Sequence, residues 1–154
     1  MDVLSAANKR QAGGEDIVHL ELGEPATPAP REAIEVAQSA LQAEPLGYTE
    51  AFGLASLRAR IAEFYRLRHG IAVDAERIVV TTGSSGGFVL SFLAAFDPGD
   101  RVALTDPSYP AYRNILLALG IEPVVLAAGR ETGYQPTVEL VERAGGELDG
   151  LIVA

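Results

Sequence analysis

Apolar residues recur at helical spacing in three stretches of the first half of the chain. The first stretch ends at Gly13-Gly14, which predicts a short helix that packs one side. Pro30 is well placed to begin a second helix, which we expect to run to about Ala43. A loop over residues 44–53 precedes a third, amphipathic helix, for which Gly70 is the stop. Its apolar stripe consists of Leu54, Leu57, Ile61, Phe64 and Tyr65.

The pattern changes from Arg77 onward to an alternation of short apolar strands and helices. Continuous apolar strands joined by helical crossovers are typical of a parallel sheet covered on both faces, so the chain is predicted to be an α/β protein. Asp97-Pro98-Gly99-Asp100 is expected to form a turn, and Gly120 suits a helix C-terminus. Strands are predicted at 78–81, 102–105, 123–126 and 151–154, and helices at 88–96, 112–119 and 138–143.

These patterns suggest two regions. Residues 1–45 are expected to hold an N-terminal arm, a short strand within residues 17–22 and a helix. Residues 46–154 are expected to be the first part of an α/β domain. Residues 149–154 have the pattern of a buried strand that has hardly begun its exit loop, so we expect the α/β domain to be truncated at its C-terminal end.

Composition excludes several classes of function. The 154 residues are 48% hydrophobic, which fits one globular domain, and a net charge of −9 with scattered acidic residues makes nucleic acid an improbable partner. The absence of cysteine excludes disulfides, thiolate metal sites and a cysteine nucleophile. The most apolar stretch, Gly86 to Phe96, is shorter than the ~20 residues of a membrane helix, and no signal peptide opens the chain. We expect a cytoplasmic protein.

The predicted strand before residue 82 runs into Gly83-Ser84-Ser85-Gly86-Gly87 and then into a helix. Free backbone N–H groups and partial positive charge at a helix N-terminus favour an anion, and glycine lets the backbone approach it closely. A phosphate group would fit there. The spacing matches neither of the two common nucleotide-binding glycine motifs, and the same residues also suit a tight turn with a helix cap.

Asp106-Pro107-Ser108-Tyr109-Pro110 follows the next strand and is therefore expected at the same edge of the sheet as the serine-glycine loop. Tyr109 lies between two prolines that restrict its backbone, so its ring could stack flat on an aromatic ligand. The alternative is a surface turn anchored by a tyrosine. The neighbouring loop favours the first interpretation.

Other polar residues give no pattern of their own. The roles of Gly23-Glu24-Pro25 and Tyr48-Thr49 cannot be derived from spacing. His19 and His69 have no partner cluster that suggests a metal or a catalytic triad, so we interpret both as structural. No metal site and no pair of carboxylates for acid/base chemistry is predicted.

The ordered set of segments resembles the class I/II aminotransferases, which are fold type I enzymes dependent on pyridoxal 5′-phosphate (PLP), over nearly the whole chain. The order of the pieces is the specific part, since each is weak alone. The matching pieces are Leu22-Gly23-Glu24-Pro25, Gly47-Tyr48-Thr49 with Gly53 and Leu57-Arg58, Val80-Thr81-Thr82-Gly83-Ser84, Pro98-Gly99-Asp100, Asp106-Pro107 with Tyr109 and Tyr112, and Leu151-Ile152-Val153-Ala154.

The resemblance implies an amino-terminal part of the large PLP-binding domain, a mostly parallel sheet flanked by helices, preceded by a helical and loop segment. It implies that the backbone of Ser84, Ser85 and Gly86 holds the PLP phosphate and that Tyr109 stacks on the pyridine ring. The parent enzyme would move an amino group between an amino acid and a 2-oxo acid, as part of amino acid metabolism and biosynthesis.

Two further roles come from the resemblance alone. Gly23 looks like the loop glycine whose N–H meets the substrate carboxylate, and Tyr48 resembles the tyrosine that reaches the cofactor phosphate of a neighbouring subunit. A homodimer with shared active sites is implied.

No catalytic residue is expected within this segment. The family's Schiff-base lysine, a later aspartate and two arginines have no counterpart here, and Lys9, the only lysine, precedes the cofactor loops. The segment alone is not expected to be active. A noncatalytic fragment or pseudoenzyme and another fold type I PLP enzyme, such as a lyase, decarboxylase or synthase, remain alternatives. A Rossmann-like nucleotide domain is disfavoured because the glycine motifs fail.

Overall fold

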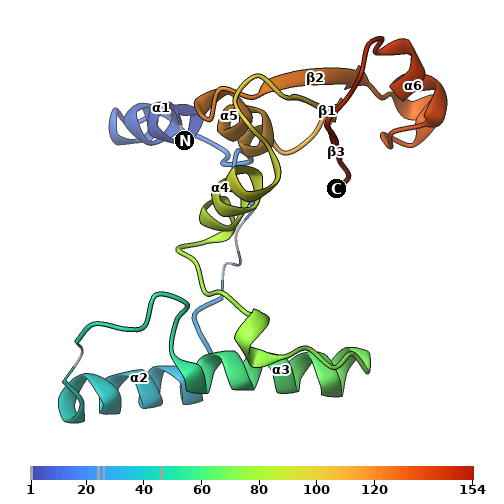
Figure 1. The fold of residues 1–154 in the computed structure, drawn as a ribbon. Coiled ribbons are helices and arrows are strands. Elements are labelled where there is room, and N and C mark those ends of the chain that lie inside the picture. The colour runs from blue at the N-terminus through green and yellow to red at the C-terminus, as the bar shows by residue number, and fades with distance from the viewer. Residues whose placement is uncertain (1, 24, 26, 46) are drawn as a thin grey trace. The chain divides into compact units, whose positions relative to one another are not determined.

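The structure is a computed structural model that describes residues 2–23, 25, 27–45 and 47–154. These residues divide into two units, residues 1–48 and 49–154. Within the described ranges, none of the helices combines the length and the apolar character needed to cross a bilayer. The first unit holds α1 (Asp2–Ala12) and α2 (Arg31–Ala43); the second holds α3 (Ala55–His69), η1 (Ala75–Arg77), α4 (Ser84–Ala95), β1 (Arg101–Asp106), α5 (Pro110–Ala118), β2 (Glu122–Ala127), η2 (Arg130–Thr132), α6 (Val138–Arg143) and β3 (Gly150–Ile152) (Figure 1).

The two helices of residues 1–48 confirm the helices predicted from the apolar spacing. α1 ends before Gly13-Gly14, and α2 follows its N-cap residue Pro30. Proline has no backbone N–H to donate inside a helix, so it suits the position where a helix begins. On the surface of α2, Arg31 donates to Glu35 one turn later, at 2.7 Å between Nε and Oε1.

Residues 17–22, predicted as a short strand, form no strand in the structure. The apolar pattern was wrong here because a strand also needs a hydrogen-bonded neighbour, and none is present among the described residues. Instead His19 fastens this segment to the end of α1: its Nδ1 lies 2.6 Å from Glu21 Oε1 and its Nε2 lies 3.1 Å from Gln11 Oε1. The hydrogen bond from His19 lowers the pKa of the Glu21 carboxyl. Glu24, in the predicted loop that follows, lies outside the described residues.

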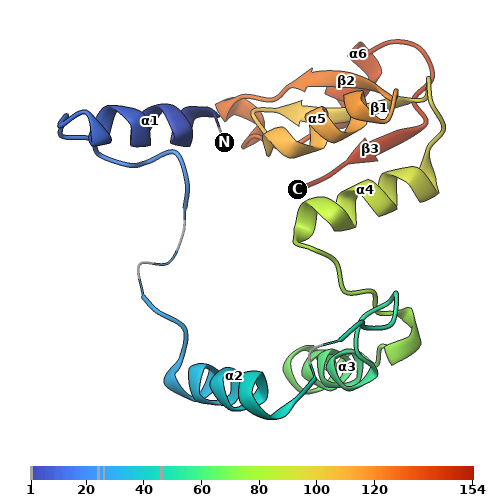
Figure 2. The same cartoon turned by 90° about the vertical axis from the view of Figure 1, so that its left-hand side faces the viewer.

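Residues 101–152 form a parallel sheet of three strands in the order β2–β1–β3. In register, Val102 of β1 pairs with Pro123 of β2 and with Gly150 of β3. The sheet and its flanking helices confirm the predicted α/β class. Because the strands are parallel, their carboxyl ends meet at one edge of the sheet (Figure 2).

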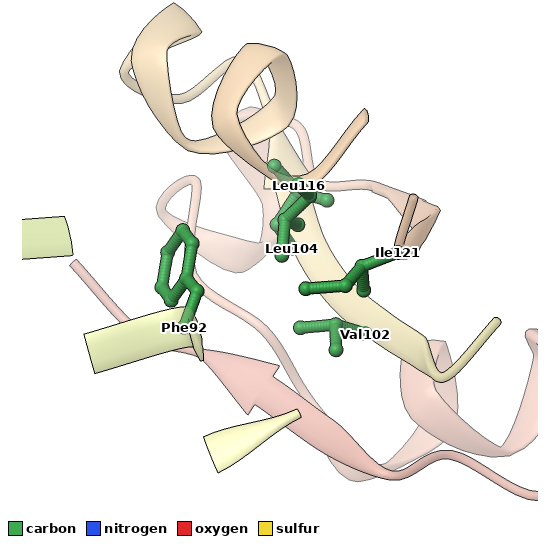
Figure 3. Close-up of a cluster of buried hydrophobic side chains, with 5 residues drawn as sticks. All are labelled: Phe92, Val102, Leu104, Leu116 and Ile121. Atoms are coloured by element: carbon green, nitrogen blue, oxygen red, sulfur yellow. The ribbon is translucent and has the colours of Figure 1, made fainter. Parts of the chain in front are cut away.

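The core lies between the central strand and two helices that cover one face of the sheet. Figure 3 shows Phe92 of α4 and Leu116 of α5 converging on β1. Val102 and Leu116 are fully buried, and burying such side chains stabilises a fold by about 1.5–3 kcal/mol each. The buried cluster is Phe92, Val102, Leu104, Leu116 and Ile121. Its position fixes where α4 and α5 begin relative to the ends of the strands.

The opposite face of the sheet carries α6, which packs beside β2. Leu126 is buried, whereas Leu151 of β3 remains 43% exposed. The helix begins at the cap residue Thr137, whose Oγ1 accepts a hydrogen bond from the Leu140 N–H at 3.3 Å. Both faces of the sheet are therefore covered as predicted, the second one in part.

The predicted strand at residues 78–81 is wrong for the structure described. These residues form no ladder, and the Val80 N–H donates instead to Phe52 O at 3.0 Å. An apolar run indicates that a segment can be buried, but it does not specify a partner strand. The sequence pattern alone therefore could not predict whether these residues pair in a sheet. The next helix also begins earlier than predicted, at Ser84 instead of Phe88, because small residues form its first turn.

The predicted turn and helix stops are confirmed. Asp100 N–H donates to Asp97 O at 3.1 Å across the turn before β1. Gly70 ends α3 with φ of 68°, a left-handed conformation that glycine adopts at little cost.

Candidate functional site

The first turn of α4 presents backbone N–H groups at the end of the 78–83 segment. Gly83 is the N-cap, with φ of 80° and ψ of 172°, and its N–H donates to Thr81 O at 2.9 Å. The hydroxyl of Thr81 in turn donates to Gly83 O at 2.7 Å, which closes a tight turn. The N–H groups of Ser84, Ser85 and Gly86 come next, where an α-helix offers its donors no internal acceptor.

The electrostatics of this turn suit an anion. No acidic side chain lies in the first turn of α4, so the positive end of the helix dipole is not offset there. A Cβ added to Gly86 would lie 3.4 Å from Thr81 Cβ and 3.5 Å from Thr82 Oγ1, so Gly86 packs close to these two side chains. The free N–H donors and the uncompensated helix dipole fit a phosphate group.

Tyr109 lies at the start of α5, directly after the loop that leaves β1. It is the N-cap of α5, and its side chain is half exposed. Its ring meets the ring of Tyr112 edge to face, with centroids 5.4 Å apart, and Tyr112 meets Phe88 in the same way at 4.8 Å. Since Phe88 belongs to the second turn of α4, these rings join the starts of the two helices.

The geometry thus brings Tyr109 and the Ser84–Gly86 turn to the same end of the sheet. Figure 2 shows the starts of α4 and α5 at the end toward which β1 and β3 point. In parallel α/β sheets this edge is where ligands bind, because helix N-termini and loops meet there. An aromatic ring next to a phosphate-sized group of donors is suited to a flat, phosphorylated ligand. The cofactor roles of these residues stay predictions.

The other two predicted site residues belong to residues 1–48. Tyr48 is fully exposed, and a Cβ added to Gly23 would meet nothing within 4 Å. Their roles also stay predictions. His69 lies at the end of α3, edge-on to Phe64 at a centroid distance of 5.9 Å. Over the described part of the chain, no group of three His, Cys, Asp or Glu side chains is arranged to hold a metal ion.

The sequence pointed to Arg58 of α3 only as part of the Leu57-Arg58 segment and predicted no role for its side chain. Its side chain is 12% exposed, and its guanidinium donates to three acceptors. The available signal was its position on the apolar stripe of the helix, one turn from Leu54 and Ile61, where a cation is unexpected.

Comparison with known proteins assigns the family. The family profile described as aminotransferase class I and II matches residues 15–153 of the chain. The chain belongs to the class I and II aminotransferase family. This confirms the resemblance found in the ordered sequence segments.

Individual class I and II aminotransferases agree with this placement. A valine–pyruvate aminotransferase of Mycobacterium tuberculosis is 48% identical over 154 residues, which are 100% of this chain and 40% of that protein. A crystal structure of an aminotransferase from Mycobacterium tuberculosis matches 98% of this chain with a TM-score of 0.89 and 48% identity, over 39% of its own length. The aspartate aminotransferase of Thermus thermophilus, solved with maleate, matches 94% of this chain and 38% of its own with a TM-score of 0.85 and 31% identity. The chain thus spans about two fifths of such relatives.

Proposed function

We propose that the protein containing this chain is a PLP-dependent aminotransferase that moves an amino group between an amino acid and a 2-oxo acid. The observation that carries the proposal is the meeting of two features at one sheet edge. They are the free N–H groups of Ser84, Ser85 and Gly86, and the half-exposed ring of Tyr109. Family membership supports it.

The chain's own residues would bind and orient the cofactor. The backbone amides at the start of α4 would donate to the phosphate, and the Tyr109 ring would lie against the pyridine ring. PLP, when bound, supplies an electron sink for the bonds at the amino acid's α-carbon. The chain itself contributes position and charge, because Lys9 is the only lysine in these 154 residues and lies on α1, before the cofactor loops.

The remaining roles follow the family. Gly23 would donate its N–H to the substrate carboxylate, and Tyr48 would reach the cofactor phosphate of a second subunit in a homodimer with shared sites. The lysine that holds the cofactor, the aspartate at the pyridine nitrogen and the two arginines are expected in the family's remaining sequence. We propose a cytoplasmic enzyme of amino acid metabolism, with valine and pyruvate as the first substrate pair to test, because a 48% identical relative bears that name.

The test uses the full-length protein loaded with PLP. Bound PLP should give a visible absorbance band that shifts when an amino acid is added, and a 2-oxo acid should accumulate in step with the new amino acid. Valine with pyruvate is compared with aspartate and with aromatic donors. An unchanged band with every amino acid would remove the aminotransferase proposal and favour a pseudoenzyme. A shifted band whose product is not the 2-oxo acid would indicate a lyase, decarboxylase or synthase.

A further inference from the structure

Arg58 occupies an unusual environment for a cation on a helix. Its Nε donates to Gly53 O, its Nη1 to Ala75 O and its Nη2 to Glu50 Oε2, each at 3.2 Å. The side chain is 12% exposed, whereas Glu50 is 65% exposed. Because burying a charge is costly unless it is hydrogen-bonded, the three acceptors explain how this guanidinium is tolerated.

The acceptors come from two separate stretches of chain. Gly53 and Glu50 belong to the loop before α3, and Ala75 begins η1, which lies 17 positions after Arg58. A planar guanidinium can serve acceptors in several directions at once, whereas a lysine ammonium is a point charge on a flexible stem. Arg58 therefore ties the 50–53 loop to the segment that leads toward Val80.

A second set of contacts joins the 50–53 loop to that segment directly. Val80 N–H donates to Phe52 O at 3.0 Å. Gly53 has φ of 93°, and a Cβ built on it would lie 2.7 Å from Val80 Cβ, closer than side-chain atoms approach one another. The loop therefore packs closely against Val80, which immediately precedes the Thr81–Gly83 turn.

The contacts form a continuous path from Arg58 to the start of α4. Arg58 donates hydrogen bonds to the 50–53 loop, and this loop accepts a hydrogen bond from the Val80 N–H. The next residue, Thr81, donates its hydroxyl to Gly83 O, directly before Ser84. We propose that Arg58 is a positioning residue for the phosphate site, acting through Gly53 and Val80 on the amides that open α4. The inference rests on the proposed PLP-dependent function, because it gives those amides their ligand.

The experiment compares affinities of the full-length apoprotein for PLP and for pyridoxal, which lacks the phosphate. Variants are Arg58→Gln, Arg58→Lys and the matched control Arg60→Gln, which removes an exposed arginine of α3 paired with Glu63. If Arg58→Gln displaces the turn that binds the phosphate, this variant should bind PLP about 10- to 100-fold more weakly than wild type. Pyridoxal affinity should change less than about threefold, and Arg60→Gln should match wild type for both ligands. Arg58→Lys should lose almost as much as Arg58→Gln.

Gly53→Ala supplies an independent route that leaves the charge in place. Its new Cβ should push Val80 and reproduce the selective loss of PLP affinity, so the proposal stays testable if Arg58→Gln does not fold. Wild-type PLP affinity in both Arg58→Gln and Gly53→Ala would overturn the inference, as would equal losses for PLP and pyridoxal. A wild-type protein that binds PLP no better than pyridoxal would instead overturn the proposed phosphate site and the function built on it.

Discussion

Tyr109 presents a ring that is half exposed at the start of α5, held edge-on by Tyr112. If this ring stacks on the cofactor, Tyr109→Ala should weaken PLP binding by about 1 kcal/mol, roughly fivefold in Kd. Tyr109→Phe should bind PLP nearly as well as wild type, because stacking uses the face of the ring. Titration of the full-length apoprotein with PLP measures both. Tyr65→Ala, which truncates a similarly exposed tyrosine on α3, is the control, and an unaltered Kd for Tyr109→Ala would exclude stacking.

Gly83 and Gly87 lie four residues apart, yet alanine should have opposite effects at the two positions. Gly83 has φ of 80° and ψ of 172°, a region that only glycine enters easily, so Gly83→Ala should cost about 1–3 kcal/mol of unfolding free energy. Gly87 is helical and a Cβ there would meet only Thr81 Oγ1, at 3.7 Å. Gly87→Ala should therefore stabilise the protein by about 0.5–1 kcal/mol. Urea denaturation of the full-length apoprotein checks the signs, and equal shifts in one direction would contradict the conformational argument.

At the residue scale, the sequence predicted the local backbone features on which the candidate site is built, and the roles of its residues stay predictions. Ser84 and Gly86 follow from a glycine-serine run before a helix, and Tyr109 follows from its place between two prolines after a strand. Arg58 could not be predicted in the same way. One of its acceptors is Ala75 O, and nothing in the spacing of residue types shows which backbone carbonyl a side chain will meet.

At the scale of elements, apolar periodicity predicted the helices and the three paired strands. Helix stops were accurate where glycine supplied a left-handed conformation, as at Gly70. The failures at residues 17–22 and 78–81 share one cause. A helix satisfies its own backbone, but a strand depends on a neighbour that the local sequence does not specify.

The packing of α5 on β1 can be tested with two adjacent leucines. Leu116 is fully buried against Val102 and Leu104, whereas Leu117 is 54% exposed on the same helix. Leu116→Ala should lower the unfolding free energy by about 2–5 kcal/mol, because it opens a cavity in the core. Leu117→Ala should change it by less than about 0.5 kcal/mol. Urea denaturation of the full-length protein gives both values, and similar losses at the two positions would show that another part of the protein covers Leu117.

The helix α4 has apolar side chains that the described residues do not bury. Phe92 points into the core and is 7% exposed, but Leu90 and Leu93 remain 52% and 59% exposed. A helix that is apolar all round is usually buried between two layers. The described residues cover one side of α4, which agrees with a chain that spans about two fifths of its relatives.

At the scale of the whole molecule, the sheet has a strand edge that no described strand pairs with. Among the described residues β3 pairs with β1 alone, and residues 78–81 form no ladder. An unpaired edge presents a row of N–H and C=O groups to any other chain.

The 154-residue segment expressed alone should therefore self-associate or melt without cooperativity, whereas the full-length protein should not. The driving force is the free edge of β3 together with the apolar side chains beside it, Leu151 and Val153, which are 43% and 65% exposed. A lysine near a free edge disfavours edge-to-edge pairing, so Val153→Lys should shift the segment toward smaller species. Size-exclusion chromatography with light scattering measures the mass, and calorimetry measures the transition. A wild-type segment that is monomeric and melts in one cooperative step would show that the free edge of β3 does not drive association.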